Sequence, residues 1–416
     1  MPIHTISAAL DNASSSTLTT AAITAVGLTI LRTYLGGRTS TWERESAGKM
    51  ILIAGPLSPT ILALIHHLLH LPSPPQILCL VPFPSPLPEE ILTILHTLRI
   101  GITNPLAQLH CEPLPRTPAG VREFARKWSS VEQGLAGEGG RRIDAILLSS
   151  GWEIQSEPIN SGEEWTTEQF HFHLITALLP HLLRQPAERN IRIISLLSPT
   201  WAAAIPSLHG VRRSDSLVQQ VGERSLRALL VMKHFQLILD TLASATYGKK
   251  LDVPIPDGSV KKRDKSIQSN IMALGVVMPW ARTEVVRGLL KVDSSWLRWF
   301  LYILFYPIIM FLTPSPRKSM QSILFALSAP VRYSSGPADG SVITGSSDTT
   351  TDGTDMEENR RGVQGGDVVR DCAVIQVPPV LSDSTRAKEA YDGLEKEVEG
   401  RIKAKQDSPS NKSKSE

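Results

Sequence analysis

The sequence predicts a doubly wound α/β domain, in which helices cover both faces of a parallel sheet. Short apolar segments of strand length recur along the chain, and segments with helical periodicity separate them. The first pair is a strand at 50–54 and a helix that reaches residue 71, joined by the tight turn Gly-Pro-Leu-Ser-Pro at 55–59. Strands that alternate with helices in this way form parallel sheets through right-handed crossovers.

The remaining elements follow from the same two periodicities. Further strands are expected at 77–81, 109–111, 142–148, 191–197, 271–278 and 371–377. Further helices are expected at 88–98, 121–128, 167–183, 226–245, 320–329 and 386–403. Pro88 suits the first turn of its helix, where the missing N–H would have no partner in any case.

Composition divides the chain into five parts. A Rossmann-like domain is expected at 46–333 and is completed by a strand and a helix at 367–404. An N-terminal targeting or membrane-anchor segment occupies 1–45. The Gly-, Ser-, Thr- and Asp-rich residues 334–366 are expected to form a disordered insertion, and 405–416 a disordered tail.

Charge and cysteine content exclude several classes of protein. The net charge is only +3 and the basic residues are scattered, so no nucleic-acid partner is indicated. Three cysteines without a CxxC motif point to a reducing compartment without disulfides or a zinc cluster. His66 and His70 lie one helical turn apart but lack a third ligand, so no metal site is predicted.

Two apolar segments outside the domain core suggest contact with a membrane. Leu18 to Leu31 is uncharged and precedes Arg32, which favours a membrane anchor, a targeting segment or an ordinary amphipathic helix. Residues 294–312 are rich in Trp, Phe and Tyr and are interrupted by Pro307. This second segment suits either an interfacial helix pair or a lid helix packed over the core.

Several short motifs occur in a fixed order between Met50 and Ala404. They are Ile51–Gly55, Val121–Ala125, Ile143–Leu147, Leu178–Leu182, Arg192–Ile194 with Ser198, Pro279–Thr283, Pro316–Ser328 and Cys372–Glu395. This order resembles the short-chain dehydrogenase/reductase superfamily, most closely its membrane-associated retinol-dehydrogenase-type branch. The chain is also similar to an uncharacterised fungal family of mitochondrial, dehydrogenase-like proteins.

The resemblance implies an NAD(P) site at the first turn, from which the chain departs. The family writes Thr-Gly-x-x-x-Gly-Ile-Gly, whose glycines let the backbone approach the pyrophosphate. Here Ala54, Gly55, Pro59 and Ile61 stand at the matching positions. The cofactor-contacting positions that the resemblance assigns are Gly55, Ser58, Glu112, Ser149, Gly151 and Thr283.

The resemblance also places a catalytic serine and lysine, but no tyrosine. The family uses a Tyr as general acid/base, a Lys four residues later and a Ser that binds the carbonyl oxygen. Ser198 and Lys233 fit the Ser and Lys positions, whereas Leu229 replaces the Tyr. No tyrosine occurs between Tyr34 and Tyr247, so no register restores the motif.

Three hypotheses on function follow. The first is a membrane-associated, reductase-like protein with lost or altered catalysis, which binds no NAD(P) or binds it weakly and serves as a scaffold or binding partner. The second is an NAD(P)-dependent oxidoreductase of a lipid-like carbonyl or alcohol. The third is a protein that binds an apolar ligand in the former substrate cleft. A protein partner or homodimer, and a mitochondrial or endoplasmic reticulum membrane, are expected.

Overall fold

The computed structural model confirms the predicted α/β architecture. It describes residues 37–42, 44–134, 142–150, 165–186, 189–209, 217–251, 269–279, 313–332 and 362–406, with isolated positions within 19–30 and 296–306. These residues form a sheet in the order β3-β2-β1-β4-β5-β6-β7-β8, parallel except for the β7–β8 pair. The strands are β1 (Met50–Ala54), β2 (Gln76–Val81), β3 (Gln108–Pro113), β4 (Ala145–Leu148), β5 (Ile191–Leu197), β6 (Ile271–Val277), β7 (Val368–Arg370) and β8 (Ala373–Ile375).

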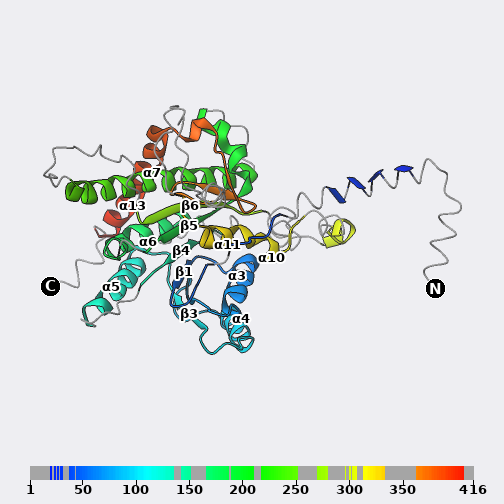
Figure 1. Ribbon diagram of the computed structural model, residues 1–416, viewed down its shortest axis with the longest axis horizontal. Coiled ribbons are helices and arrows are strands. Elements are labelled where there is room, and N and C mark those ends of the chain that lie inside the picture. The colour runs from blue at the N-terminus through cyan, green and yellow to red at the C-terminus, as the bar shows by residue number, and fades with distance from the viewer. Residues whose placement is uncertain are drawn as a thin grey trace, which may run out of the picture.

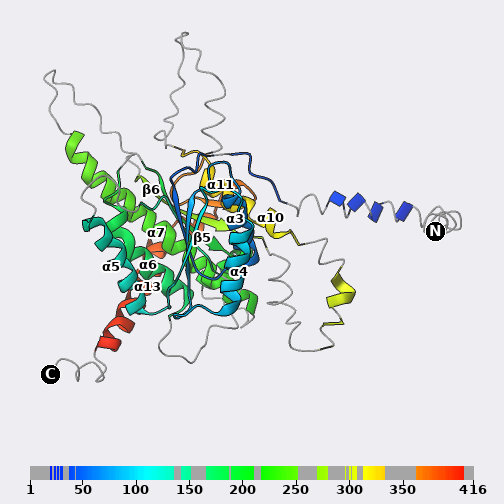
Figure 2. The ribbon, with the colours of Figure 1, turned by 90° about the horizontal axis from the view of Figure 1, so that it is seen from below.

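Helices cover both faces of this sheet (Figures 1 and 2). On one face lie α3 (Pro59–Leu69), α4 (Glu89–Ile100), α10 (Pro316–Ser319) and α11 (Gln321–Ser328). On the other lie α5 (Pro118–Gly134), α6 (Thr167–Leu182) and α7 (Leu217–Leu251), with α13 (Ser384–Gln406) packed against α6 and α7. Two 3-10 segments, η1 (Pro199–His209) and η4 (Pro379–Leu381), complete the described elements.

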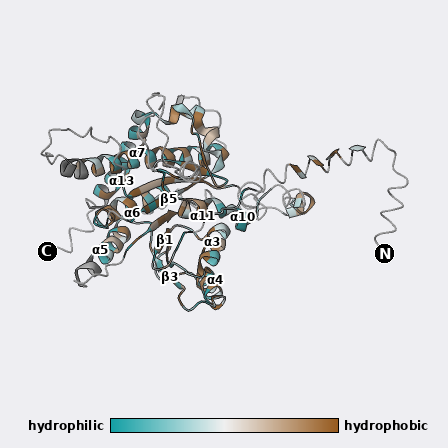
Figure 3. Ribbon diagram, in the orientation of Figure 1, coloured by the Kyte–Doolittle hydropathy of each residue, from teal (hydrophilic) through white to brown (hydrophobic). Residues whose placement is uncertain are grey.

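Strand β1 shows why the inner strands of the sheet are mostly apolar. Ile51 and Ile53 join the core formed with α3, α4 and α11, whereas Leu52 and Ala54 join the core formed with α5, α6 and α7. Successive side chains point to opposite faces, so a strand covered on both faces has no position that faces solvent. The central strand β5 is also mostly apolar (Figure 3), and its buried Arg192 donates a hydrogen bond to the carbonyl of Ala326.

The structure corrects two of the predicted elements. The single strand expected at 371–377 is a hairpin, in which β7 and β8 pair antiparallel around Asp371 and Cys372. Both turn residues have positive φ, 49° and 57°, as a tight two-residue hairpin turn requires. The helix expected at 226–245 is longer and begins at Leu217. Its additional N-terminal turns, which the apolar periodicity did not predict, lie toward the end of β5.

Parts of the two segments flanking the domain lie against it. Within the predicted insertion 334–366, Val363 pairs with Val331 and the N–H of Gly366 donates to the carbonyl of Ala273. Near the N-terminus, the N–H of Ser40 donates to Oε1 of Gln321, and Trp42 packs on the core. In the predicted segment 18–31, the described positions 19, 20, 23, 24, 26, 27, 29 and 30 are helical and exposed, and the other six lie outside the described residues, as do residues 333–361.

The strand order places a topological switch point between β1 and β4. From β1 the chain moves outward to β2 and β3, then returns to the other side of β1 to form β4, β5 and β6. The segments that follow β1 and β4 therefore diverge and leave a crevice at the carboxyl ends of these strands. In open α/β sheets, ligands bind in such a crevice.

Gly55 is expected to be indispensable at this switch point. Its φ is +126°, and a Cβ built on it would lie 2.1 Å from the carbonyl oxygen of Ser149. We expect Gly55→Ala to lower the free energy of unfolding by at least about 2 kcal/mol, through backbone strain and this clash. Urea denaturation followed by circular dichroism measures the loss.

Gly400→Ala is the matched control for this substitution. A Cβ at Gly400, on α13, meets no atom within 4 Å, so alanine is expected to raise the free energy of unfolding by ~0.5–1 kcal/mol. A Gly55→Ala midpoint equal to that of the wild type would contradict the proposed role of the glycine.

Candidate functional site

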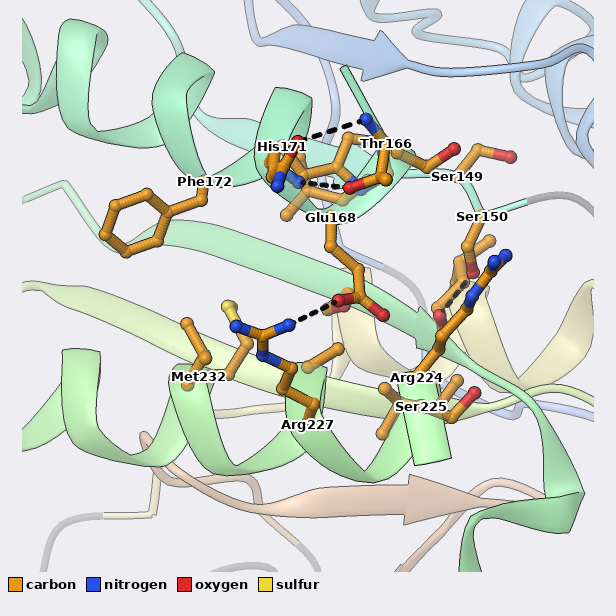
Figure 4. Close-up of a pocket in the computed structure, with 18 of the residues that line it drawn as sticks. Ser149, Ser150, Thr166, Glu168, His171, Phe172, Arg224, Ser225, Arg227 and Met232 are labelled. Carbon is orange, nitrogen blue, oxygen red and sulfur yellow. Dashed lines mark hydrogen bonds and ion pairs between the residues drawn. The ribbon is translucent and has the colours of Figure 1, made fainter. Parts of the chain in front are cut away.

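A cavity of about 540 Å³ lies at the switch point. The ends of β1, β4 and β5 and the facing sides of α6 and α7 form its walls, as Figure 4 shows. Ser149 and Ser150 line it directly after β4, and Ser198 lines it after β5. Three of the predicted positions, Ser58, Ser149 and Ser198, thus share this cavity.

The polar groups of the turn after β1 form hydrogen bonds within the protein. Ser58 caps α3, because its Oγ accepts the N–H of Ile61 at 3.3 Å, while its own N–H donates to the carbonyl of Pro56 at 3.0 Å. The hydroxyl of Ser149 donates to the same carbonyl at 3.0 Å. Pro56 and Pro59 have no N–H. Few backbone donors therefore remain for a phosphate at this helix N-terminus.

The other predicted cofactor positions add little to a dinucleotide site. Glu112, at the end of β3, forms an ion pair with Lys127 at 3.6 Å and does not line the cavity. No acid follows β2, where Val81 and Pro82 stand. Gly151 and Thr283 lie outside the described residues. The roles of these positions toward a cofactor stay predictions.

Ser198 is held at the cavity by the start of α7. Its N–H donates to Oγ of Ser225 at 3.0 Å, and its own Oγ lies 2.9 Å from Oγ1 of Thr200. Ser198 and Ser225 both line the cavity. The segment of α7 that faces the predicted serine is therefore the one around Ser225, two turns before Lys233.

Lys233 lies at a different place. Its Nζ donates to the carbonyl of Leu381 at 3.2 Å, in a second cavity that Asp367 and Arg332 also line. Burial lowers the pKa of Lys233, and the carboxylate of Asp367 acts in the opposite direction. Leu229, four residues earlier on the same helix face, packs toward Gly275 of β6. The structure does not bring Lys233 and Ser198 together, and their catalytic roles stay predictions.

The face of α7 that lines the switch-point cavity carries other residues. Arg224, Ala228, Val231 and Met232 all line it. Arg224 was not predicted because the expected helix began at residue 226. Residues three and four apart share a helix face, and Ala228 lies three residues before Val231 and four before Met232. Arg224 lies four residues before Ala228, so the same spacing predicts it on this face.

His171, on α6, was not predicted as a site residue. It is only 8% exposed, lines the cavity, and its Nε2 has no hydrogen-bond partner among the described residues. Burial lowers its pKa to about 4, although a hydrogen bond to the backbone of Ala54 opposes this shift. The ring is therefore neutral near pH 7.

Ion pairs close the cavity between α6, α7 and α13. Arg227 lies 3.8 Å from Glu168 on α6 and 2.6 Å from Glu397 on α13, and Figure 4 shows the first of these pairs across the cavity. Nε2 of Gln169 also donates to Glu397, at 3.2 Å. Among the described residues no group of three or more His, Cys, Asp or Glu side chains is placed to hold a metal ion.

Comparison with known proteins agrees with an oxidoreductase-type fold. No known protein-family model matches the chain. A protein of Saccharomyces cerevisiae named Uncharacterized oxidoreductase YNL181W is 26% identical over 310 residues, which cover 71% of each chain.

Solved structures that resemble the chain are short-chain dehydrogenase/reductases. L-sorbose reductase of Gluconobacter frateurii, solved with NADPH and L-sorbose, is 14% identical with a TM-score of 0.38, over 68% of this chain and 90% of its own. A short-chain dehydrogenase/reductase of Mycobacterium ulcerans is 13% identical with a TM-score of 0.40, over 68% and 85%. At these scores the fold assignment rests on the strand order itself, which agrees with the resemblance seen in the sequence.

The depressed pKa of His171 predicts that stability falls in mild acid. The unfolded imidazole titrates near pH 6.5 and the folded one near 4, so protons favour the unfolded chain as the pH drops between these values. From pH 7.5 to pH 5.0 we expect His171 to account for a loss of ~2 kcal/mol in the free energy of unfolding. Urea titrations of the wild type and His171→Asn at both pH values measure it. An equally steep loss in the variant would contradict this assignment.

Proposed function

We propose that this protein is a ligand-binding protein built on a short-chain dehydrogenase/reductase fold, and that it does not use the catalytic relay of that family. One observation carries the proposal. The cavity at the switch point is retained, and Ser198 lines it, but Lys233 lies in another cavity and Leu229 stands in place of the tyrosine. Without a phenol beside the lysine, a proton has no route to a substrate alkoxide by the family mechanism.

Three tyrosines whose side chains the structure describes do not replace the missing one. Tyr391, on α13, packs its ring on Phe172 at 5.1 Å and on His234 at 5.1 Å, and it does not line the cavity. Tyr302 packs edge-on against Tyr306 outside the cavity. These contacts support a binding role for the cavity rather than proton transfer by a phenol.

An NAD(P)-dependent oxidoreductase acting on a lipid-like carbonyl or alcohol is the second candidate. Its support is the position of Ser198 at the end of β5, in the same cavity as the turn after β1. The name of the yeast relative points in the same direction. This candidate needs a proton donor other than tyrosine and a phosphate contact other than the turn at Gly55.

Titration with NADH and NADPH separates the two candidates. We expect calorimetry on the full chain to give dissociation constants weaker than about 100 µM for both nucleotides, because the turn after β1 uses its donors internally. Binding in the low micromolar range, together with NADPH oxidation by an aliphatic aldehyde that Ser198→Ala abolishes, would overturn the proposal in favour of the oxidoreductase.

We also propose that the protein associates with a membrane surface. At the positions described, 296–306 is helical and stands apart from the sheet in Figures 1 and 2. Trp296, Trp299, Phe300, Ile303 and Leu304 follow helical spacing and are between 47% and 79% exposed. Such an exposed apolar stripe, followed by the exposed cations at 317 and 318, suits the lipid–water interface.

Another helix meets the length and composition of a membrane span. Among the described residues it is Val218–Ala245, with mean hydropathy 1.2. This segment is α7, which packs on η1, β5, β6 and α13. Its apolar character therefore reflects its place in the core, and the membrane proposal rests on the aromatic stripe.

Vesicle flotation tests this association. We expect the full chain to float with phosphatidylcholine/phosphatidylserine vesicles, and Trp299→Ser/Phe300→Ser to reduce the floated fraction severalfold by removing apolar surface. Ile100→Ser/Leu106→Ser is the matched control, since both residues are exposed and apolar but lie elsewhere. A wild-type chain that stays at the bottom of the gradient would contradict the proposal. An equal reduction of the floated fraction by the two double substitutions would contradict it too.

A further inference from the structure

A second cavity, of about 960 Å³, lies at the edge of the sheet and apart from the switch point. The β7–β8 hairpin forms one side of it, and residues 38–42, which precede β1, form another. Lys233 lines it from α7 and Phe325 lines it from α11. The two cavities share none of the lining residues that the structure describes, so this cavity is a separate site.

The charged side chains that line this second cavity leave an excess of positive charge. Among the described residues they are three cations, Arg38, Lys233 and Arg332, and one carboxylate, Asp367, which gives a net charge of +2. The carboxylate of Asp367 accepts from Nη2 of Arg332 at 3.1 Å and from the N–H of Gln364 at 2.8 Å. Asp367 therefore balances Arg332, and the excess charge lies with Lys233 and Arg38.

The ammonium of Lys233 has a neutral partner. Its Nζ donates to the carbonyl of Leu381 at 3.2 Å, and among the described residues it forms no ion pair. Burial lowers the pKa of Lys233, although the more distant carboxylate of Asp367 opposes this shift. An ammonium has three N–H donors, so an anion in the cavity can pair with it and offset the cost of its burial.

Ser40 supplies a second donor to this cavity. Its Oγ is buried and has no hydrogen-bond partner among the described residues. Its N–H donates to Oε1 of Gln321 at 3.0 Å. The backbone bond therefore holds Ser40 in place, and its hydroxyl is left to donate to an acceptor in the cavity.

We propose that this second cavity binds a phosphate monoester with an apolar chain, whose phosphate pairs with Lys233 and accepts the hydroxyl of Ser40. A phosphate monoester carries a charge of about −1.5 to −2 at pH 7, which matches the charge of the lining. Trp42 and Phe325 line the same cavity and offer apolar surface to the chain. The inference goes beyond the proposed function, because it concerns a different site.

Calorimetry on the full chain with hexyl phosphate and 1-hexanol tests the proposal. We expect hexyl phosphate to bind at least about tenfold tighter than the alcohol, because only the phosphate pairs with the ammonium. Lys233→Met, which keeps an unbranched side chain, is expected to weaken hexyl phosphate binding about tenfold, the usual worth of a hydrogen bond to a charged group. Equal affinity of the wild type for the two probes, or no binding of hexyl phosphate, would overturn the proposal.

Ser40→Ala gives a second test that leaves α7 unchanged. It removes Oγ but keeps the N–H that bonds to Gln321, and the affinity for hexyl phosphate is expected to fall about fivefold. Ser46→Ala is the matched control, because its Oγ donates to the carbonyl of Arg44 at 3.1 Å and Ser46 does not line the cavity. An affinity that falls equally in Ser40→Ala and Ser46→Ala, or in neither, would overturn the role of Ser40.

Arg224→Met shows whether the probe binds in the switch-point cavity instead, which Arg224 lines. Loss of hexyl phosphate binding in Arg224→Met but not in Lys233→Met would place the ligand at the switch point and overturn the proposal.

A soluble alkyl phosphate and phosphatidic acid in a membrane share this chemistry. Flotation with phosphatidylcholine vesicles that contain phosphatidic acid distinguishes them. A floated fraction that phosphatidic acid raises more in the wild type than in Lys233→Met identifies the lipid as the ligand. Equal fractions, together with hexyl phosphate binding that depends on Lys233, identify the soluble ester.

Discussion

The contact between the turn after β1 and the end of β4 is the constraint on which the site depends. Gly55 touches the backbone of Ser149 so closely that no side chain fits between them. The N–H of Ser149 donates to the carbonyl of Ala54, and its hydroxyl donates to that of Pro56. These bonds fix the two strand ends side by side, although the segments beyond them diverge. The crevice between those segments therefore has a rigid base.

The same contact changes what this crevice can bind. In a dinucleotide-binding turn, glycines leave backbone N–H groups free for the pyrophosphate. Here two prolines have no N–H, and Ser58 caps its own helix. The residues thus stabilise the turn itself, and the polar groups that line the cavity are hydroxyls, the ring of His171 and charged side chains such as Arg224 and Arg227.

The sequence carried enough information for the sheet, but not for the site. Strands such as β1, β5 and β6 are buried on both faces, so composition alone marks them. The position of Lys233 could not be predicted from the sequence. The rotation of a helix against a sheet is set by packing contacts, such as that between Leu229 and Gly275. A lysine four residues after an apolar residue fits the family spacing whichever way the helix is turned. His171 gave no sequence signal, since its role depends on its burial and on its bond to Ala54.

A neutral imidazole with an unsatisfied nitrogen is costly in the interior. Replacing His171 by an apolar side chain would remove both the buried lone pair and the loss of stability in mild acid. Local features that lower stability without a structural gain are expected at functional sites. His173 is buried in part and also has an unsatisfied Nε2, but it faces Trp165 rather than a cavity. The difference between the two histidines is therefore access to the cavity, which His171 lines and His173 does not.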